Sequence, residues 1–203
     1  LDDYVLPRPM NLKTKPFPYS SDQTPYASGS GPRETFTGND FRKAYAPGVT
    51  QTGSGQAVGL LEFDGYFPSD ISSYKAQSGL PNVPIRNVLL DGVDGSAGGY
   101  NFEVALDIDM ALSMAPGLSE VIVYEGFFAN DILNRMATDN QARQLSSSWG
   151  YGPQTDPTRR QILQQFAAQG QTMFQASGDL GAWTAQVAPP SDDPWLTIVG
   201  GTS

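Results

Sequence analysis

The sequence predicts an α/β fold, with a doubly wound, mostly parallel sheet and helices on both of its faces. Short apolar runs of strand length alternate with helical stretches about six times along the chain, a pattern typical of parallel sheets. Runs such as 56–63 and 120–124 are nearly continuous in apolar residues, as expected of buried strands. The 203 residues suffice for one domain of about 160–180 residues and an extension.

That extension is expected at the N-terminus. Residues 1–35 should form an extended arm, and residues 36–203 the folded part. No hydrophobic period survives the prolines scattered through the arm, which are Pro7, Pro9, Pro16, Pro18, Pro25 and Pro32.

The elements follow in order from Phe36. We expect strands at 56–63, 83–90, 120–124, 142–148, 171–176 and 195–199, and helices at 40–45, 69–77, 101–115, 130–140 and 157–168. Thr37 or Asn39 suits the start of the first helix and Ser69 that of the second, because short polar side chains cap helices. Pro157 fits the first turn of the last helix, and Gly170 its end.

Composition narrows the chemistry. The net charge of −9 and the pI near 4.3 argue against nucleic acid as a partner, because phosphates require Lys and Arg. There is no Cys, hence no thiol nucleophile, and no His, the usual general base near neutral pH. Acid–base chemistry must therefore use carboxylates, which favours acidic working conditions. No apolar run is long enough for a membrane span.

The expected helix at 101–115 carries a carboxylate pair. Glu103 and Asp107 are four residues apart, so they lie one turn from each other on the same helix face. Because their neighbours are apolar, a partly buried pair that shares a proton is one interpretation, and a solvated acidic face is the other.

Three strand ends offer further polar groups at what should be one edge of the sheet. They are Glu62 with Asp64, the run Ser-Ser-Ser-Trp-Gly at 146–150, and Asp179 between two glycines. Function sits at the carboxyl ends of strands in such sheets. The alternatives are a solvated Glu62, a core position for Trp149, and a turn in which Asp179 bonds its own backbone. The sequence holds no dinucleotide loop, phosphate loop, calcium loop or Gly-x-Ser-x-Gly elbow.

Four motifs follow one another along the chain. They are Glu103-x-x-x-Asp107 after a Gly-rich loop, the run at 146–150, Ser-Gly-Asp at 177–179 and Val-Gly-Gly-Thr at 199–202. In this order and spacing, the motifs resemble those of the sedolisin family of serine-carboxyl peptidases. The resemblance covers about residues 36–203 and implies a subtilisin-like fold, incomplete in this chain. The arm resembles the junction between a removable pro-domain and the enzyme.

The resemblance also implies roles. Glu103 would be the general base, Asp107 would orient it and share its proton, and Asp179 would line the oxyanion hole. Ser148, Trp149 and Gly150 would edge the cleft for a polypeptide substrate, and Glu62 would be a supporting carboxylate. Where many members have Ser after the oxyanion Asp, Leu180 stands here.

The family's catalytic serine belongs to a later Gly-Thr-Ser-x-x-x-Pro motif, and Ser203 occupies the place of an earlier strand. A missing C-terminal segment or complementary chain would therefore supply the serine, and the family's calcium site with it. The resemblance implies an acid-acting endopeptidase, made as a zymogen and secreted or kept in another acidic compartment. The alternatives are an inactive peptide-binding relative, or a carboxylate-based metal-binding or glycoside-cleaving domain.

Overall fold

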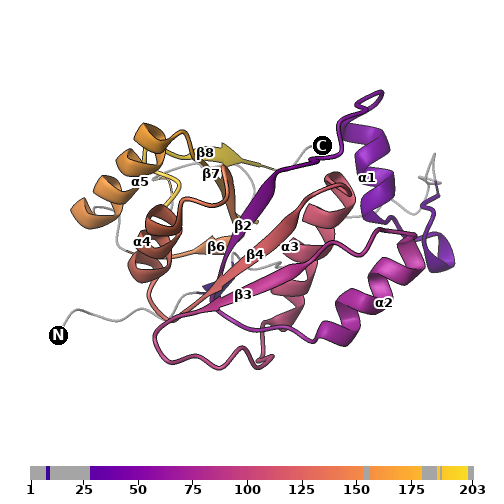
Figure 1. Ribbon diagram of the computed structural model, residues 1–203, viewed down its shortest axis with the longest axis horizontal. Coiled ribbons are helices and arrows are strands. Elements are labelled where there is room, and N and C mark those ends of the chain that lie inside the picture. Colours follow the sequence, from indigo (N-terminus) through magenta and orange to yellow (C-terminus); the bar gives the residue numbers. More distant parts are fainter. Residues whose placement is uncertain (1–7, 10–27, 153–155, 180–186, 188, 201–203) are drawn as a thin grey trace.

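A six-stranded, wholly parallel sheet forms the centre of the molecule, in the order β3-β4-β2-β5-β7-β8 (Figure 1). The computed structural model describes residues 8–9, 28–152, 156–179, 187 and 189–200. The strands of this sheet are β2 (Ala57–Glu62), β3 (Ile85–Leu89), β4 (Glu120–Glu125), β5 (Gln144–Ser147), β7 (Thr172–Ala176) and β8 (Thr197–Val199). The expected α/β class and strand alternation are confirmed.

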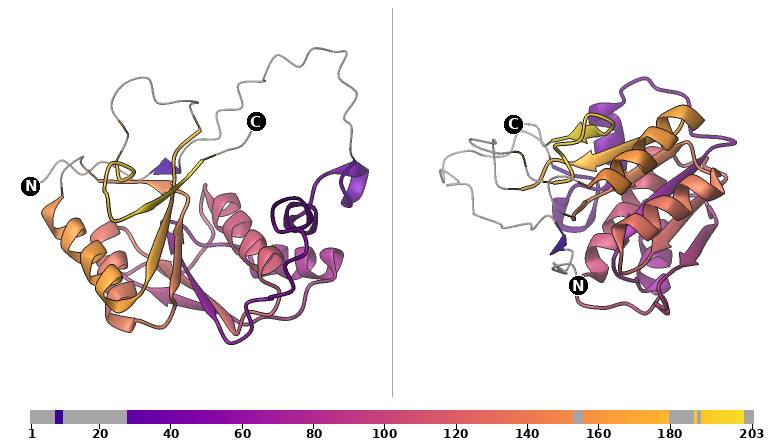
Figure 2. Two further views of the ribbon diagram at one scale, coloured as in Figure 1. Left: turned by 90° about the horizontal axis from the view of Figure 1, so that it is seen from above. Right: turned by 90° about the vertical axis from the view of Figure 1, so that its left-hand side faces the viewer.

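Helices cover both faces of the sheet. They are α1 (Gly38–Tyr45), α2 (Pro68–Ser78), α3 (Asn101–Met114), α4 (Ala129–Asp139) and α5 (Pro157–Gln169), with a short 3-10 helix η1 (Pro32–Glu34) before them. Helices α3 and α4 both contact β2 and β4, and they do so from opposite sides. Figure 2 shows α1 and α2 grouped with α3, and α5 grouped with α4. The predicted doubly wound arrangement is therefore present.

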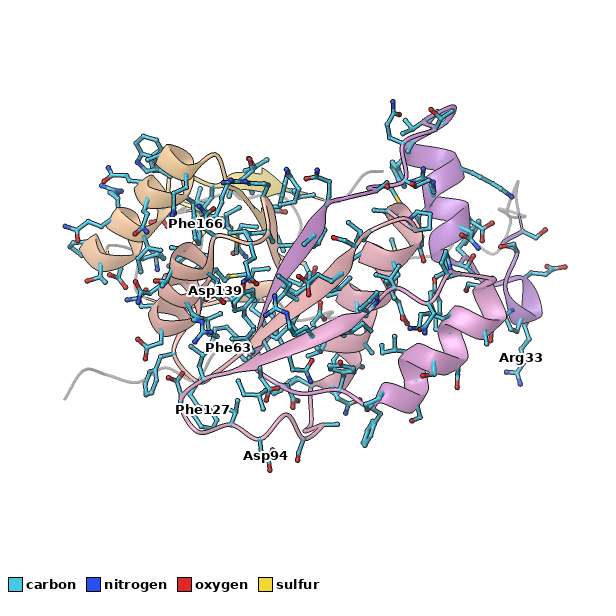
Figure 3. The ribbon with its side chains drawn as sticks, in the orientation of Figure 1. Arg33, Phe63, Asp94, Phe127, Asp139 and Phe166 are labelled. Atoms are coloured by element: carbon cyan, nitrogen blue, oxygen red, sulfur yellow. The ribbon has the colours of Figure 1, made fainter. Side chains whose placement is uncertain are left out.

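The core lies in two layers, one on each face of the sheet. On α3, Val104, Ile108 and Leu112 recur every four residues and are completely buried, so they form one helix stripe that packs on the strands. On the other face, Ile132 of α4 is completely buried and Phe166 of α5 is 1% exposed. Figure 3 shows Phe166 on α5. The remaining face of α3 is thus free to carry polar groups.

The helix termini correct one expectation. Thr37 does cap α1, but Ser69 lies inside α2, which begins at Pro68 after Phe67. Proline suits the first helical turn because its missing N–H has no partner there anyway. At the start of α5, Asp156 accepts a hydrogen bond from the Arg159 N–H at 3.0 Å.

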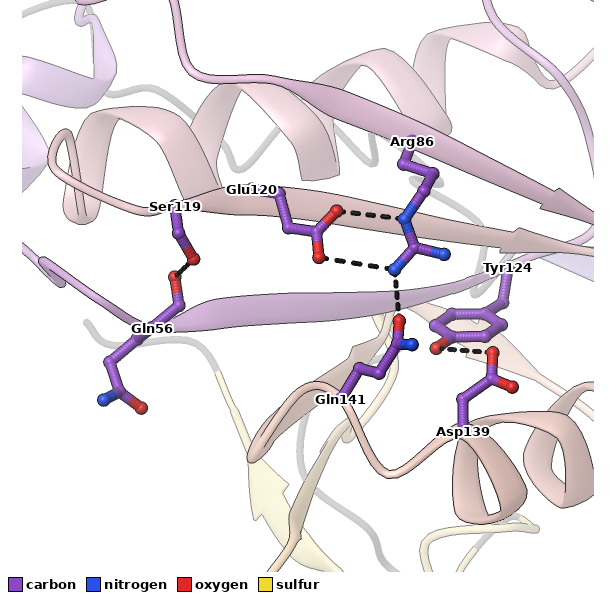
Figure 4. A network of polar contacts seen from close by, with 7 residues as sticks. All are labelled: Gln56, Arg86, Ser119, Glu120, Tyr124, Asp139 and Gln141. Atoms are coloured by element: carbon purple, nitrogen blue, oxygen red, sulfur yellow. Dashed lines mark hydrogen bonds and ion pairs between the residues drawn. The ribbon is translucent and has the colours of Figure 1, made fainter.

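A polar network ties β3 and β4 to the end of α4 (Figure 4). Arg86 pairs with Glu120, Nε to Oε2 at 3.0 Å, and also contacts Gln141. The Tyr124 hydroxyl donates to Asp139 Oδ2 at 3.3 Å. Glu120 opens β4, so this network supports the amino-terminal edge of the sheet.

Part of the expected arm is paired. The two-residue strand β1 (Arg8–Pro9) runs antiparallel to β6 (Trp149–Gly150), with Arg8 opposite Gly150 and Pro9 opposite Trp149. The rest of the arm up to residue 27 lies outside the described residues, and the boundary at 35/36 stays a prediction. Within the described ranges, none of the helices is long and apolar enough to cross a membrane.

Candidate active site

Glu62 is a fully buried carboxyl at the carboxyl end of β2. Its Oε2 accepts a hydrogen bond from the Trp149 indole Nε1 at 2.7 Å, across 87 positions of sequence. Burial, reinforced by the negative charge of Asp107, raises the pKa of Glu62 well above its usual value. A carboxyl in this setting retains its proton. The solvated alternative for Glu62 does not describe this side chain.

Asp107 on α3 lies beside Glu62. Its Oδ1 accepts a hydrogen bond from the Ser148 Oγ at 2.7 Å. Burial raises the pKa of Asp107 to about 6, although hydrogen bonds from Ser148 and Glu62 oppose the rise. Two buried oxygens of these carboxyls, Asp107 Oδ2 and Glu62 Oε1, accept no hydrogen bond from an N–H or O–H group of the described residues. The negative charge of Asp107 raises the pKa of Glu62, so the two carboxyls titrate as a pair.

Glu103 lies one turn before Asp107 and is only 7% exposed. Burial raises its pKa to about 7, and the negative charges of Asp107 and Asp179 add to the rise, while the Ser148 hydroxyl opposes it. The pair on α3 is therefore not a solvated acidic face. It is the partly buried pair that the helical spacing made possible.

Asp179 follows β7 at the same edge of the sheet. Gly178 precedes it with a φ of +94°, a backbone conformation that glycine adopts without strain. The Asp179 residue is exposed, and the burial that remains raises the pKa of its carboxyl. Because its charge acts on Glu103, the structure brings Asp179 to the α3 pair from a different element.

Trp149 is a core residue whose indole is 1% exposed. Phe63 and Tyr100 pack edge-on against it, with ring centroids 5.4 and 6.1 Å away. The side chain thus orients Glu62, and Gly150 follows it as the second residue of β6. That Ser148, Trp149 and Gly150 edge a substrate cleft stays a prediction.

For two groups at this edge, sequence reasoning pointed to the residue but not to its contacts. Ser148 was expected to edge a cleft, and its hydroxyl contacts Asp107. Asp64 was expected with Glu62 at the end of a strand, and it accepts hydrogen bonds from the loop before α3. The signal for Asp64 was its position, two residues after a strand at the carboxyl edge of the sheet. Among the described residues, no group of acids is arranged to hold a metal ion.

The chain is similar to known proteins in sequence and in fold. The chain is 26% identical over 196 residues to Kumamolisin from Bacillus sp. (strain MN-32), covering 86% of this chain and 36% of that protein. It is similar to the solved structure of Pseudomonas sedolisin, a serine-carboxyl proteinase complexed with two molecules of pseudo-iodotyrostatin. The TM-score is 0.72 at 21% identity, covering 86% of this chain and 54% of that one. No family model matches the chain.

The fold is therefore the subtilisin-like α/β fold, present here as part of a domain. Kumamolisin and the Pseudomonas enzyme together support the assignment made from the motifs, that of a sedolisin-family fragment. Members of that family are serine peptidases. The chain spans about a third to a half of the length of these two relatives.

Proposed function

We propose that this chain is the part of an acid-acting serine-carboxyl endopeptidase that carries the general base and the oxyanion carboxyl. One observation carries the proposal. Glu103 and Asp179 come from different elements yet interact at one sheet edge, and a buried carboxyl pair lies directly behind Glu103. Perturbed carboxyls gathered at the carboxyl ends of parallel strands are typical of catalytic sites.

Glu103 is the base in this proposal. Its carboxylate takes the proton of a serine hydroxyl as the serine oxygen attacks the peptide carbonyl carbon, and later gives that proton to the leaving amine. Asp107 orients Glu103 and shares the proton that Glu103 takes up. The proton shared by Asp107 and Glu62 keeps the pair behind Glu103 from carrying two full negative charges, which burial would make costly.

Asp179 donates a hydrogen bond to the oxyanion that forms during attack. Only a protonated carboxyl can donate, so this role requires acid or a raised pKa. Burial does raise the pKa of Asp179. We therefore expect hydrolysis to have an acidic pH optimum, because Asp179 must be protonated and the chain has no His to act as a base near neutral pH.

The pKa of Glu103, about 7 in this chain, is high for a base that works in acid. A serine hydroxyl that donates to Glu103 favours the charged form of Glu103. We therefore expect the complete site to have a Glu103 pKa below 7. The serine belongs to a further segment or complementary chain, in keeping with relatives about twice this length or more.

A polypeptide substrate lies extended along β6. The support for this is β1, which pairs antiparallel with Trp149–Gly150 and shows that an extended chain fits there. Substrate peptides are recognised in this way when they add a strand to a sheet edge. The same pairing supports a removable pro-segment that occupies the cleft before activation. Secretion, or residence in another acidic compartment, completes this part of the proposal.

Calcium is bound within the sedolisin family. The described residues do not fit such a site, because no set of three or more acids among them can hold a metal ion. A calcium site would have to be formed elsewhere in the complete protein.

The decisive experiment is Glu103→Gln in the complete protein. Peptide hydrolysis should fall on the order of 1000-fold, the usual size of a general-base contribution, while the unfolding transition stays in place. Asp109→Asn is the matched control. Asp109 is on the same helix with a pKa raised to about 7 by burial, but the charges that act on it come from α2. An active Glu103→Gln variant, or an optimum at neutral pH, would overturn the proposal.

A further inference from the structure

The N-terminus of α3 is held by the side chain of Asp64, which lies in the loop after β2. Asp64 Oδ2 accepts a hydrogen bond from the Tyr100 N–H at 2.6 Å, and Asp64 Oδ1 accepts one from Gly98 at 2.6 Å. Tyr100 is the residue that caps α3, and its own side chain makes no capping hydrogen bond. The carboxylate of Asp64 thus replaces a local cap, and it is well placed to interact with the positive end of the helix.

The packing around this contact leaves no room for a side chain at Gly98. A Cβ there would lie 2.6 Å from Asp64 Oδ1 and 2.9 Å from Oδ2. At the neighbouring Gly99, a Cβ would meet nothing within 4 Å. The loop therefore approaches the carboxylate closely at one glycine and is open at the next, which shows that the contact is tightly fitted.

Residues 62–64 contact the candidate active site at both ends, through Glu62 and through Asp64. Glu62 closes β2 and bonds Trp149, and Asp64, two residues on, holds Tyr100, whose ring packs edge-on against the same Trp149. Glu103 follows Tyr100 by three residues, in the first turn of α3. The position of Glu103 is thus linked to the end of β2 both through Asp107 and through Asp64.

We propose that Asp64 is a positioning residue, which fixes the first turn of α3 and thereby the burial of Glu103 beside Asp107. This role rests on the proposed function for its catalytic meaning, but its structural content can be tested without activity. If the first turn of α3 loosens, Glu103 gains contact with water and moves away from the charges of Asp107 and Asp179. Both changes favour the ionised form.

The chain contains a matched control for the chemistry. Asp91, in the loop after β3, holds α4 in the same way, because its Oδ2 accepts hydrogen bonds from the Phe127 and Phe128 N–H groups at 2.9 and 3.0 Å. Phe128 is the residue that caps α4. Asp64 and Asp91 therefore perform the same helix-start function, but only the helix held by Asp64 carries the candidate base.

The test is the titration of the Glu103 side-chain carboxyl, followed by carbon-13 NMR in the 203-residue chain. Asp64→Asn and Gly98→Ala should each lower the pKa of Glu103 by about one unit, a tenfold loss of proton affinity. Asp91→Asn and Gly99→Ala should leave it unchanged. Gly98→Ala retains the Asp64 charge, so a shift common to both variants comes from the position of the helix and not from the lost charge.

Amide exchange in the unaltered chain gives a second readout if a variant fails to fold. The Gly98 and Tyr100 amides should exchange more slowly than the Gly99 amide, by on the order of tenfold or more. The proposal is wrong if Glu103 titrates alike in Asp64→Asn and the parent, if Asp91→Asn shifts it equally, or if the Gly98 and Tyr100 amides are unprotected. Failure of Glu103→Gln to affect hydrolysis would overturn the proposed function and leave these measurements valid.

Discussion

Two buried glutamates end neighbouring strands of the sheet, and they differ in what they touch. Glu62 of β2 and Glu125 of β4 are paired in register, so their side chains project from the same face. Both are almost completely buried, and burial raises the pKa of both, to about 7 for Glu125. Glu62 bonds the Trp149 indole and interacts with Asp107, whereas Glu125 Oε2 has no hydrogen-bond partner.

This difference shows that burial and a raised pKa do not by themselves identify a catalytic group. The charges that act on Glu125 are those of Asp64 and Asp94, which belong to loops at the sheet edge. Figure 3 shows Asp94 at the rim of the molecule, in the loop between β3 and α3. Glu62 is distinguished by its connection to Asp107, and through it to Glu103.

The largest expected effect concerns Glu125 together with Glu103, the candidate base. The pKa values of Glu103 and Glu125, about 7 in the folded chain, lie above the usual 4.5, so the folded state binds protons more tightly. Their contribution to stability is complete below pH 4.5 and is lost as the pH rises through 7. The chain should therefore lose on the order of 3 kcal/mol of unfolding free energy for each of the two groups between pH 4.5 and 8.

Urea unfolding at the two pH values measures this loss. Glu125→Gln should reduce the pH dependence, because Gln cannot ionise and retains the size of the side chain. Equal stability at both pH values, or greater stability at pH 8, would show that these carboxyls are not held protonated by the fold.

A smaller effect is expected from Trp149→Phe, which removes a partner that only Glu62 has. Loss of the indole N–H leaves a buried acceptor oxygen unsatisfied and some space unfilled, so stability should fall by about 2 kcal/mol. The pKa of Glu62 should rise further, because the lost hydrogen bond is one that lowers it. Trp195→Phe, at a residue 46% exposed, should cost less than about 0.5 kcal/mol in the same unfolding assay.

The smallest effect is on hydrolysis by the complete protein. Glu62→Gln can still bond Asp107 but cannot exchange a proton with it, so the rate should fall about tenfold, less than for the base itself. Glu125→Gln should stay within about twofold of the parent, because Glu125 lies outside the Asp107–Glu103 connection. Equal losses in the two variants would remove the distinction drawn between the two glutamates.

The parts of the fold that depend on local patterns could be predicted from the sequence. The helix at 101–115 was expected from apolar spacing and its stop at Pro116, and α3 spans Asn101–Met114. Because i and i+4 residues share a helix face, the pairing of Glu103 with Asp107 followed from that spacing alone. The end of α5 at Gly170 was likewise foreseeable, and Gly170 has the left-handed conformation that closes many helices.

The connections between elements could not be predicted in this way. Glu62 and Trp149 are 87 positions apart, and no local pattern specifies which strand end meets which. The start of α2 shows a weaker limit, since Ser69 as a cap and Pro68 in the first turn are both acceptable helix starts, and α2 begins at Pro68. The backbone N–H groups that donate to Asp64 could not be predicted for the same reason, because they lie on a loop 34–36 positions away.

The pairing of β1 with β6 has a consequence for any measurement of affinity at this edge. A segment tethered to the same chain competes at a local concentration on the order of millimolar. Proline at position 9 has no N–H to donate, so the two-residue pairing is held by fewer hydrogen bonds than the ladder allows. Peptides added to the 203-residue chain must displace this internal competitor, whereas a chain starting at residue 28 would show their affinity directly.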